Sequence, residues 1–165
     1  MIKKLALLGA ARPRYEDKII DVFNNPNCEQ QCWTGWSYKI NPIKLKVLDT
    51  QFKKDGYFRL YYHDIKNPED NKFGTGTGFV EYMLIVRDYR YTEELVKSPN
   101  SECTSSIDRN KPHRLYALII DDKPKKIERK KYYDFIDFDT DNPVSKHFTL
   151  NRRNAEFRYI IDENI

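Results

Sequence analysis

Short apolar runs recur along most of this chain, in the pattern that is typical of β-strands. The first run, residues 2–8, is almost wholly apolar and ends at Gly9, which predicts a strand inside a sheet. Later runs predict strands at residues 57–63, 79–86 and 114–120 and a strand or hairpin arm at residues 126–138, with further apolar positions at residues 157–161. The pattern therefore favours a sheet of several strands.

Two segments have the apolar spacing of short helices instead. In residues 15–23 the apolar positions lie among charged ones, and an Asn-Asn-Pro sequence ends the segment. Residues 43–52 show the same kind of spacing, and Pro42 suits their first turn. We also expect a short helical turn at residues 93–96, with Thr92 as its cap. A loop that holds both tryptophans is expected between the two helices.

Helices that come early and strands that come later indicate the α+β class, with a curved or barrel-like mixed sheet and helices packed at its rim. The length of 165 residues fits one domain, spanning residues 1–165, with a core large enough to need no metal or disulfide. No internal repeat or linker interrupts it. The polar segment 98–112 is expected to be a long loop, and loops of this length are often functional.

Composition narrows the function only slightly. Lys and Arg number 29 and Asp and Glu number 25, so the net charge of +4 permits a polyanionic partner without requiring one. The densest basic run, residues 123–131, is followed directly by an acidic stretch. This arrangement fits either a solvated hairpin or an edge that contacts phosphates.

The three cysteines are an odd number without a secretory leader, which predicts free thiols in a reducing compartment. No apolar run approaches the roughly 18–20 residues of a membrane span, so we expect a soluble, cytoplasmic protein without a membrane partner. Cys28 and Cys32 have a spacing seen among metal ligands, but no second pair accompanies them. We expect neither a metal nor a cofactor.

Two patterns suggest catalysis, and each has a simpler explanation. The glycine run 74–78 resembles a phosphate-binding loop, yet a strand follows it, so close packing or a bulge is favoured. Asp88 and Asp121 end predicted strands, and with Lys123 they would suit a Mg²⁺-dependent nuclease. Acidic residues also end strands simply because those ends are solvated, so we assign no catalytic residue.

Aromatic residues offer the better candidate site. Trp33 and Trp36 lie three residues apart, Tyr62 lies in the next predicted strand, and Tyr89 and Tyr91 follow the strongest strand. Such rings either fill the core or form a slot for a flat base. Stacking contributes about 1–3 kcal/mol per base, which helps offset the cost of extruding that base from a duplex.

One series of short motifs resembles the YTH and EVE domains of the PUA-like superfamily. The motifs are Trp36-Ser37, Asn41, Lys44-Leu45, Leu60-Tyr61-Tyr62-His63, Gly78-Phe79-Val80-Glu81, residues 113–120, Asn142-Pro143 and Asn151-Arg152-Arg153-Asn154. The resemblance implies a barrel-like sheet with flanking helices and an aromatic cage for a flipped, methylated base. Trp36 resembles the cage tryptophan, Ser37 its neighbour in the pocket, and Asn41 a nearby polar position, although Asn before Pro42 is also a good helix cap.

The chain departs from this family where a second cage tryptophan would follow the glycine-led strand, so Tyr89, Tyr91 or the 98–112 loop would have to complete the cage. Similar domains target DNA in modification-dependent restriction systems. We therefore expect a non-catalytic module that binds nucleic acid, with DNA carrying N6-methyladenine or 5-methylcytosine as its partner. A nuclease and a protein-interaction domain are the alternatives.

The expected base pocket consists of Trp33, Trp36, Ser37, Asn41, Tyr62, Tyr89 and Tyr91. The expected phosphate contacts are Lys123, Lys125, Lys126, Arg129, Lys130, Arg152 and Arg153.

Overall fold

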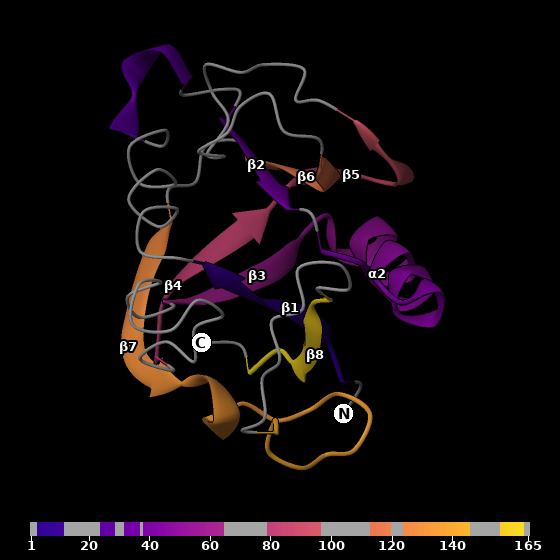
Figure 1. The fold of residues 1–165 in the computed structure, drawn as a ribbon, viewed down its shortest axis with the longest axis vertical. Helices are drawn as coiled ribbons and strands as arrows, with labels where there is room; N and C mark the ends of the chain where they lie inside the picture. The colour runs from indigo at the N-terminus through magenta and orange to yellow at the C-terminus, as the bar shows by residue number, and fades with distance from the viewer. Residues whose placement is uncertain are drawn as a thin grey trace.

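A computed structural model describes residues 3–11, 24–28, 32–36, 38–64, 79–96, 113–119, 124–145 and 156–163. Its larger sheet has five strands in the order β7 (Lys125–Lys131), β4 (Phe79–Val86), β3 (Phe58–Asp64), β1 (Leu5–Ala11) and β8 (Arg158–Ile161). The smaller sheet has three strands in the order β2 (Cys32–Trp36), β6 (His113–Ile119) and β5 (Asp88–Val96). Helix α2 (Pro42–Asp55) lies beside both sheets (Figure 1), and short 3-10 turns occur at η1 (Pro26–Cys28) and η2 (Tyr132–Asp134).

The α+β class is confirmed, but the larger sheet is open. A barrel requires its two outer strands to pair with each other. Here β7 pairs with β4 and β8 pairs with β1, so these two strands form the edges of the described sheet. The sheet is mixed, because β1 runs parallel to β3 and antiparallel to β8. The barrel-like closure expected from the sequence is therefore absent from the described strands.

Alternation along β1 explains why its sequence is apolar throughout. Leu5 and Leu7 join the core cluster on the α2 side of the sheet, whereas Ala6 and Leu8 join the cluster on the other side. All four side chains are fully or almost fully buried. Successive strand residues point to opposite faces, so a strand covered on both faces has no polar side. The prediction of an inner strand is confirmed.

Local signals define α2 as expected. The Asn41 side chain accepts a hydrogen bond from the Ile43 backbone N–H at 2.9 Å, and Pro42 opens the first turn. Gly56 ends the helix with a φ of 77°, a left-handed conformation that glycine adopts without strain. Gln51 then fixes the helix to β1, because its amide accepts from Leu5 N at 2.7 Å and donates to Leu5 O at 2.9 Å.

Two elements differ from the sequence predictions. The tryptophan-containing segment is not a loop but strand β2, which pairs antiparallel with β6, for example Trp36 with Leu115. Residues 93–96 are not a helical turn but part of β5, where Val96 pairs with His113. In both cases pairing to β6 overrides the local pattern. The predicted helix 15–23, the glycine run 74–78 and the loop 98–112 lie outside the described residues.

The expectation of free thiols is wrong for Cys28. This side chain is buried in the core and is disulfide-bonded, and its partner's side chain is outside the described residues. The sequence count of cysteines therefore gives no support to a reducing compartment. Within the described part of the chain, no helix is long and apolar enough to cross a membrane.

Gly9 is predicted to be intolerant of even a methyl group. A Cβ atom at Gly9 would lie 2.8 Å from Trp36 Cζ3 and 3.1 Å from Phe157 Cε1. We expect Gly9→Ala to lower the free energy of unfolding by about 1–3 kcal/mol, because overpacking a core forces side chains off their preferred rotamers. Urea denaturation measures the loss. A Gly9→Ala/Trp36→Phe double variant should recover part of it, and a strictly additive cycle would contradict the steric explanation.

Candidate functional site

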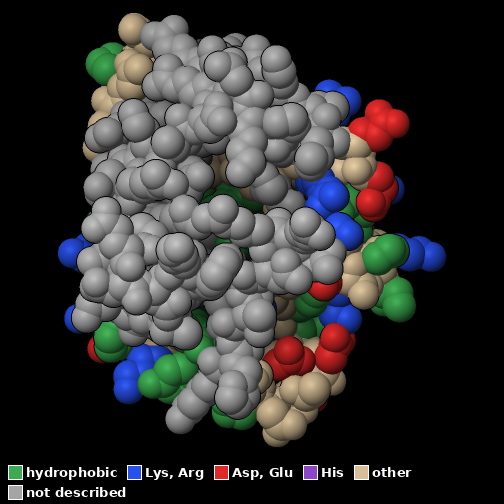
Figure 2. All heavy atoms as spheres, viewed as in Figure 1, with side chains coloured by type: hydrophobic (Ala, Val, Ile, Leu, Met, Phe, Trp, Pro, Cys, Tyr) green, Lys and Arg blue, Asp and Glu red, His purple; other side chains and the backbone are tan. Residues whose placement is uncertain are grey.

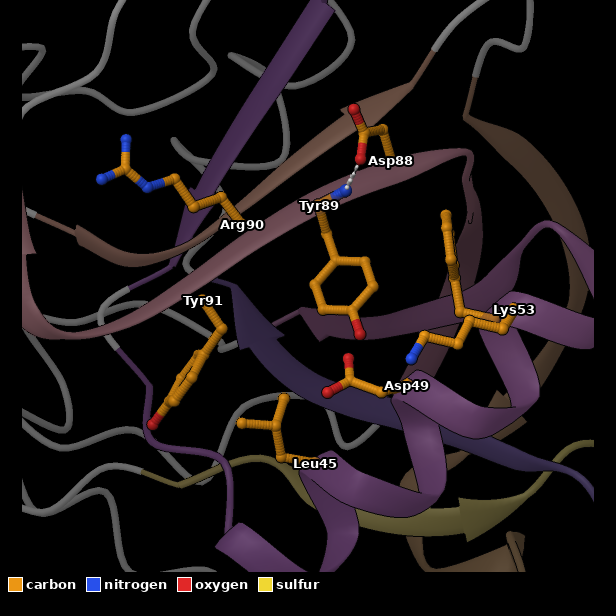
Figure 3. Close-up of a pocket in the computed structure, with 8 residues that line it drawn as sticks. Leu45, Asp49, Lys53, Asp88, Tyr89, Arg90 and Tyr91 are labelled. Carbon is orange, nitrogen blue, oxygen red and sulfur yellow. Dashed lines mark hydrogen bonds between the residues drawn. The ribbon is translucent and has the colours of Figure 1, made fainter.

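An open pocket of about 440 Å³ lies between α2 and β5 (Figure 3). Helix α2 contributes Leu45, Asp49, Phe52 and Lys53, and β5 contributes residues 88–91. The helical residues share one face because positions three and four apart are neighbours on a helix. Alternation along β5 directs Tyr89 and Tyr91 toward α2. The pocket therefore combines two tyrosine rings with a carboxylate and an ammonium group.

Tyr89 is held in place by other rings. Its ring packs edge-on against Phe52 and against Phe58, with both pairs of ring centroids 5.1 Å apart. Such contacts are worth about 0.5–1.5 kcal/mol each beyond the area they bury. This side chain forms a rigid part of the pocket wall.

Tyr91 is held by its hydroxyl group. That oxygen accepts a hydrogen bond from Ile40 N at 3.0 Å and donates to Ile40 O at 3.4 Å. Because the polar end of the side chain is occupied, the ring is fixed at the pocket without needing a ligand. In Figure 3 the ring of Tyr91 is seen edge-on and the ring of Tyr89 more nearly face-on, so a face of Tyr91 is directed toward the space between them. This face is suited to stacking.

Asp49 and Lys53 are the charged groups that face the tyrosine side of the pocket (Figure 3). Neither forms a hydrogen bond or ion pair within the described part of the chain. Two other charges of the same helix are paired, Lys44 with Asp139 at 2.7 Å and Asp55 with Lys4 at 3.1 Å. The pocket thus contains a donor and an acceptor that remain available to a ligand.

Asp88 and Arg90 also line the pocket, but their side chains point to the opposite side of β5 (Figure 3). The Asp88 carboxylate accepts a hydrogen bond from the Tyr89 backbone N–H at 2.8 Å. In the space-filling view, cationic and anionic side chains lie intermixed along the side of the molecule that α2 occupies (Figure 2). The visible surface there favours specific hydrogen bonding over attraction of one sign of charge.

Trp36 and Tyr62 do not line this pocket. Trp36 is 7% exposed and packs against Tyr38 and Phe157, each at a centroid distance of 5.6 Å. Tyr62 is 1% exposed and stacks on Tyr82 at 5.9 Å. Both belong to the core cluster on the α2 side of the sheet. The structure places them as core residues, the alternative that the sequence left open.

Three further residues of the expected base pocket are placed only in part or not at all. Asn41 caps α2, and its backbone N–H donates to the Tyr159 hydroxyl at 2.6 Å. Burial raises the pKa of Tyr159 above its ordinary range, and the same hydroxyl donates to Glu156. The backbone of Trp33 lies in β2, but its side chain is outside the description, as is Ser37.

The structure does not bring the predicted phosphate contacts to the pocket. Strand β7 is an edge of the larger sheet and lies across the molecule from α2 (Figure 1). Arg129 pairs with Glu81 at 3.3 Å and lies 3.7 Å from the centroid of the Phe79 ring. Lys130 pairs with Glu163 and lies over Phe135. Lys125 and Lys126 are exposed, whereas Lys123, Arg152 and Arg153 are outside the described residues.

The nuclease alternative cannot be assembled from what is described. Asp88 is exposed at the start of β5, and both Asp121 and Lys123 are outside the described ranges. Among the described residues, no group of three or more His, Cys, Asp or Glu side chains is arranged to hold a metal ion.

Asp49 and Lys53 were missed by the sequence interpretation. Their signal is the spacing of four on a predicted helix, which places opposite charges on one face. That spacing is common on solvated helices, so it gains meaning only when β5 places Tyr89 and Tyr91 opposite it.

Comparisons with protein-family models, with curated proteins and with solved structures find no match to this chain. The candidate site must therefore be interpreted from its own geometry and chemistry.

Proposed function

We propose that this protein is a nucleic-acid-binding module that accepts one unstacked base in the pocket between α2 and β5. One observation carries the proposal: Tyr89 and Tyr91, both assigned to a base pocket from the sequence, line the same open pocket. The ring of Tyr91 is already fixed by its hydrogen bonds to Ile40, so little side-chain entropy is lost on stacking. The volume of about 440 Å³ is in the range of small-ligand sites.

Stacking on Tyr91 supplies about 1–3 kcal/mol, and extruding a base from a duplex costs a few kcal/mol. Single strands, or duplexes with a weakened base pair, are therefore the preferred targets. Lys53 adds a positive charge at the pocket. Phosphate contacts by Lys125 and Lys126 would belong to a separate segment of the nucleic acid, since β7 lies at the far edge of the sheet.

The more specific parts of the proposal come from the resemblance. They are a PUA-like domain of the EVE/YTH type, preference for a methylated base, and a role as the DNA-targeting part of a modification-dependent restriction system. Support comes from the order of elements, in which α2 follows the Trp36 strand and leads into β3. The open sheet and the buried Trp36 mean that the pocket used here differs from the cage that the resemblance implies.

Replacing Tyr91 tests the proposal. Tyr91→Leu should weaken binding of single-stranded oligonucleotides by about 5- to 150-fold, the equivalent of one lost stacking contact. Tyr91→Phe keeps the ring and should retain most of the affinity. Fluorescence anisotropy with methylated and unmethylated oligonucleotides, at two salt concentrations, measures both variants.

Tyr133→Leu is the matched control, because Tyr133 is a partly buried tyrosine of η2 outside the pocket. It should bind as the wild type does. Unfolding curves must show that all three variants are folded at the assay temperature. Equal affinity of wild type and Tyr91→Leu, or no oligonucleotide binding at all, would refute the proposal.

A further inference from the structure

We infer that the base taken by this pocket is guanine, read on its Watson–Crick edge by Asp49 and Lys53. The inference rests on the proposed function and adds the chemical identity of the base. It differs from the methylated adenine or cytosine that the resemblance implies. Two charged side chains on one helix, and the order in which they present hydrogen-bonding groups, carry the argument.

Asp49 and Lys53 are four residues apart on α2, so they lie one helical turn apart on the same face. In Figure 3 the Asp49 carboxylate is directed into the space beside the tyrosine rings, and the Lys53 ammonium group lies next to it. An ionised carboxylate accepts through two oxygens, and an ammonium group only donates. Together they present a donor followed by two acceptors along one side of the pocket.

Guanine offers the complement of this order on its Watson–Crick edge. Its O6 atom accepts, and the adjacent N1–H and N2–H groups both donate. Stacked on Tyr91, the base would accept from Lys53 through O6 and donate from N1 and N2 to the two oxygens of Asp49. A flipped base is commonly recognised through this edge together with stacking.

The other bases fit less well. Adenine and cytosine each place a ring nitrogen acceptor beside their amino group, and this atom would face a carboxylate oxygen. Uracil and thymine have a single ring donor between two carbonyl groups, so one carbonyl oxygen would face Asp49. Leaving an acceptor against an acceptor loses a hydrogen bond and adds repulsion.

Both side chains are available for this role. Neither Asp49 nor Lys53 has a hydrogen bond or ion pair within the described residues, although they lie on adjacent turns of one helix. Leu45 and the Tyr91 ring supply apolar surface on the same side of the pocket. No rearrangement of an existing ion pair is needed before a base can bind.

The test uses the full chain and oligothymidine strands that carry one central test nucleotide: guanine, inosine, xanthine or adenine. Wild type should prefer guanine over adenine by about 5- to 150-fold, the discrimination typical of a bidentate contact. Inosine lacks the N2 amino group and should lie between them. Xanthine, with a carbonyl group at that position, should bind poorly.

Asp49→Asn supplies the decisive variant, because an amide offers one acceptor and one donor in the same shape. It should reverse the order, so that xanthine binds better than guanine. Asp134→Asn, an exposed carboxylate of η2, should leave the order unchanged. For the lysine, Lys53→Gln should weaken guanine binding more than Lys54→Gln does.

The possible failures are distinguishable. Binding that depends on Tyr91 but is equal for all four test nucleotides, or that Asp49→Asn weakens uniformly, would overturn the assignment of guanine and leave the proposed function standing. Preference for a methylated adenine or cytosine over guanine would do the same. Absence of any oligonucleotide binding would refute both proposals.

Discussion

Replacing Asp162 by alanine is expected to lower the free energy of unfolding by about 3–5 kcal/mol, the usual cost of removing one partner of a buried ion pair. The Asp162 carboxylate lies 2.6 Å from the Arg59 guanidinium and accepts a hydrogen bond from the Tyr61 hydroxyl at 3.1 Å. The two ionic side chains are only 3% and 12% exposed. Alanine would leave a buried guanidinium group without this carboxylate.

This network joins the segment after β8 to β3, on a sheet where β1 separates the two strands. The Asp162 backbone N–H also donates to Lys4 O at 2.8 Å. Burial raises the pKa of Tyr61 above its ordinary range, and the charge of Asp162 acts in the same direction, so the hydroxyl stays a donor at neutral pH. Denaturant unfolding at pH 7 measures the effect of Asp162→Ala.

Glu81→Ala is the matched control, because its ion pair with Arg129 is on the surface, with the two side chains 35% and 54% exposed. Pairs of this kind contribute about 0–1 kcal/mol. A loss for Asp162→Ala no greater than the loss for Glu81→Ala would show that the network does not hold the end of the sheet in place.

The features that could be predicted from the sequence are those whose causes are local. Helix α2 follows from Pro42 in the first turn, from apolar spacing and from Gly56 at the end. Strands β1, β3 and β4 follow from compact runs of apolar and aromatic residues. In these segments the neighbouring residues contain most of the information that determines the conformation.

The features that were missed depend on partners distant in sequence. Strand β2 contains glycine and threonine in a polar setting, and it becomes a strand because β6, far later in the chain, pairs with it. The open sheet is likewise a matter of which strands meet at the edges. Local composition cannot specify such pairings, since their cost and gain arise from loop closure and tertiary contacts.

The candidate site shows the same division. Tyr89 and Tyr91 were identified because rings just past a strong strand stand out in the sequence. Asp49 and Lys53 look like ordinary helix-surface charges until β5 is placed opposite α2. Trp36 stood out for its ring, yet a ring alone cannot show whether it fills the core or faces a ligand.

Trp36→Ala is expected to destabilise the protein by about 3–5 kcal/mol, the range found when a buried tryptophan or phenylalanine is truncated to alanine. The ring is 7% exposed and contacts Phe157 and Tyr38, and it lies close to Gly9, where a Cβ atom would have no room. Urea denaturation followed by circular dichroism measures the loss.

Trp36→Phe separates a core role from a base-binding role. The buried Nε1–H group of Trp36 has no hydrogen-bond acceptor within the described residues, so phenylalanine removes no hydrogen bond and costs mainly the lost packing. This variant should stay folded and bind oligonucleotides nearly as well as wild type, because binding depends on Tyr91. If Trp36→Phe instead abolished binding with little change in stability, the indole would be contacting the nucleic acid, and the cage implied by the resemblance would replace the pocket between α2 and β5.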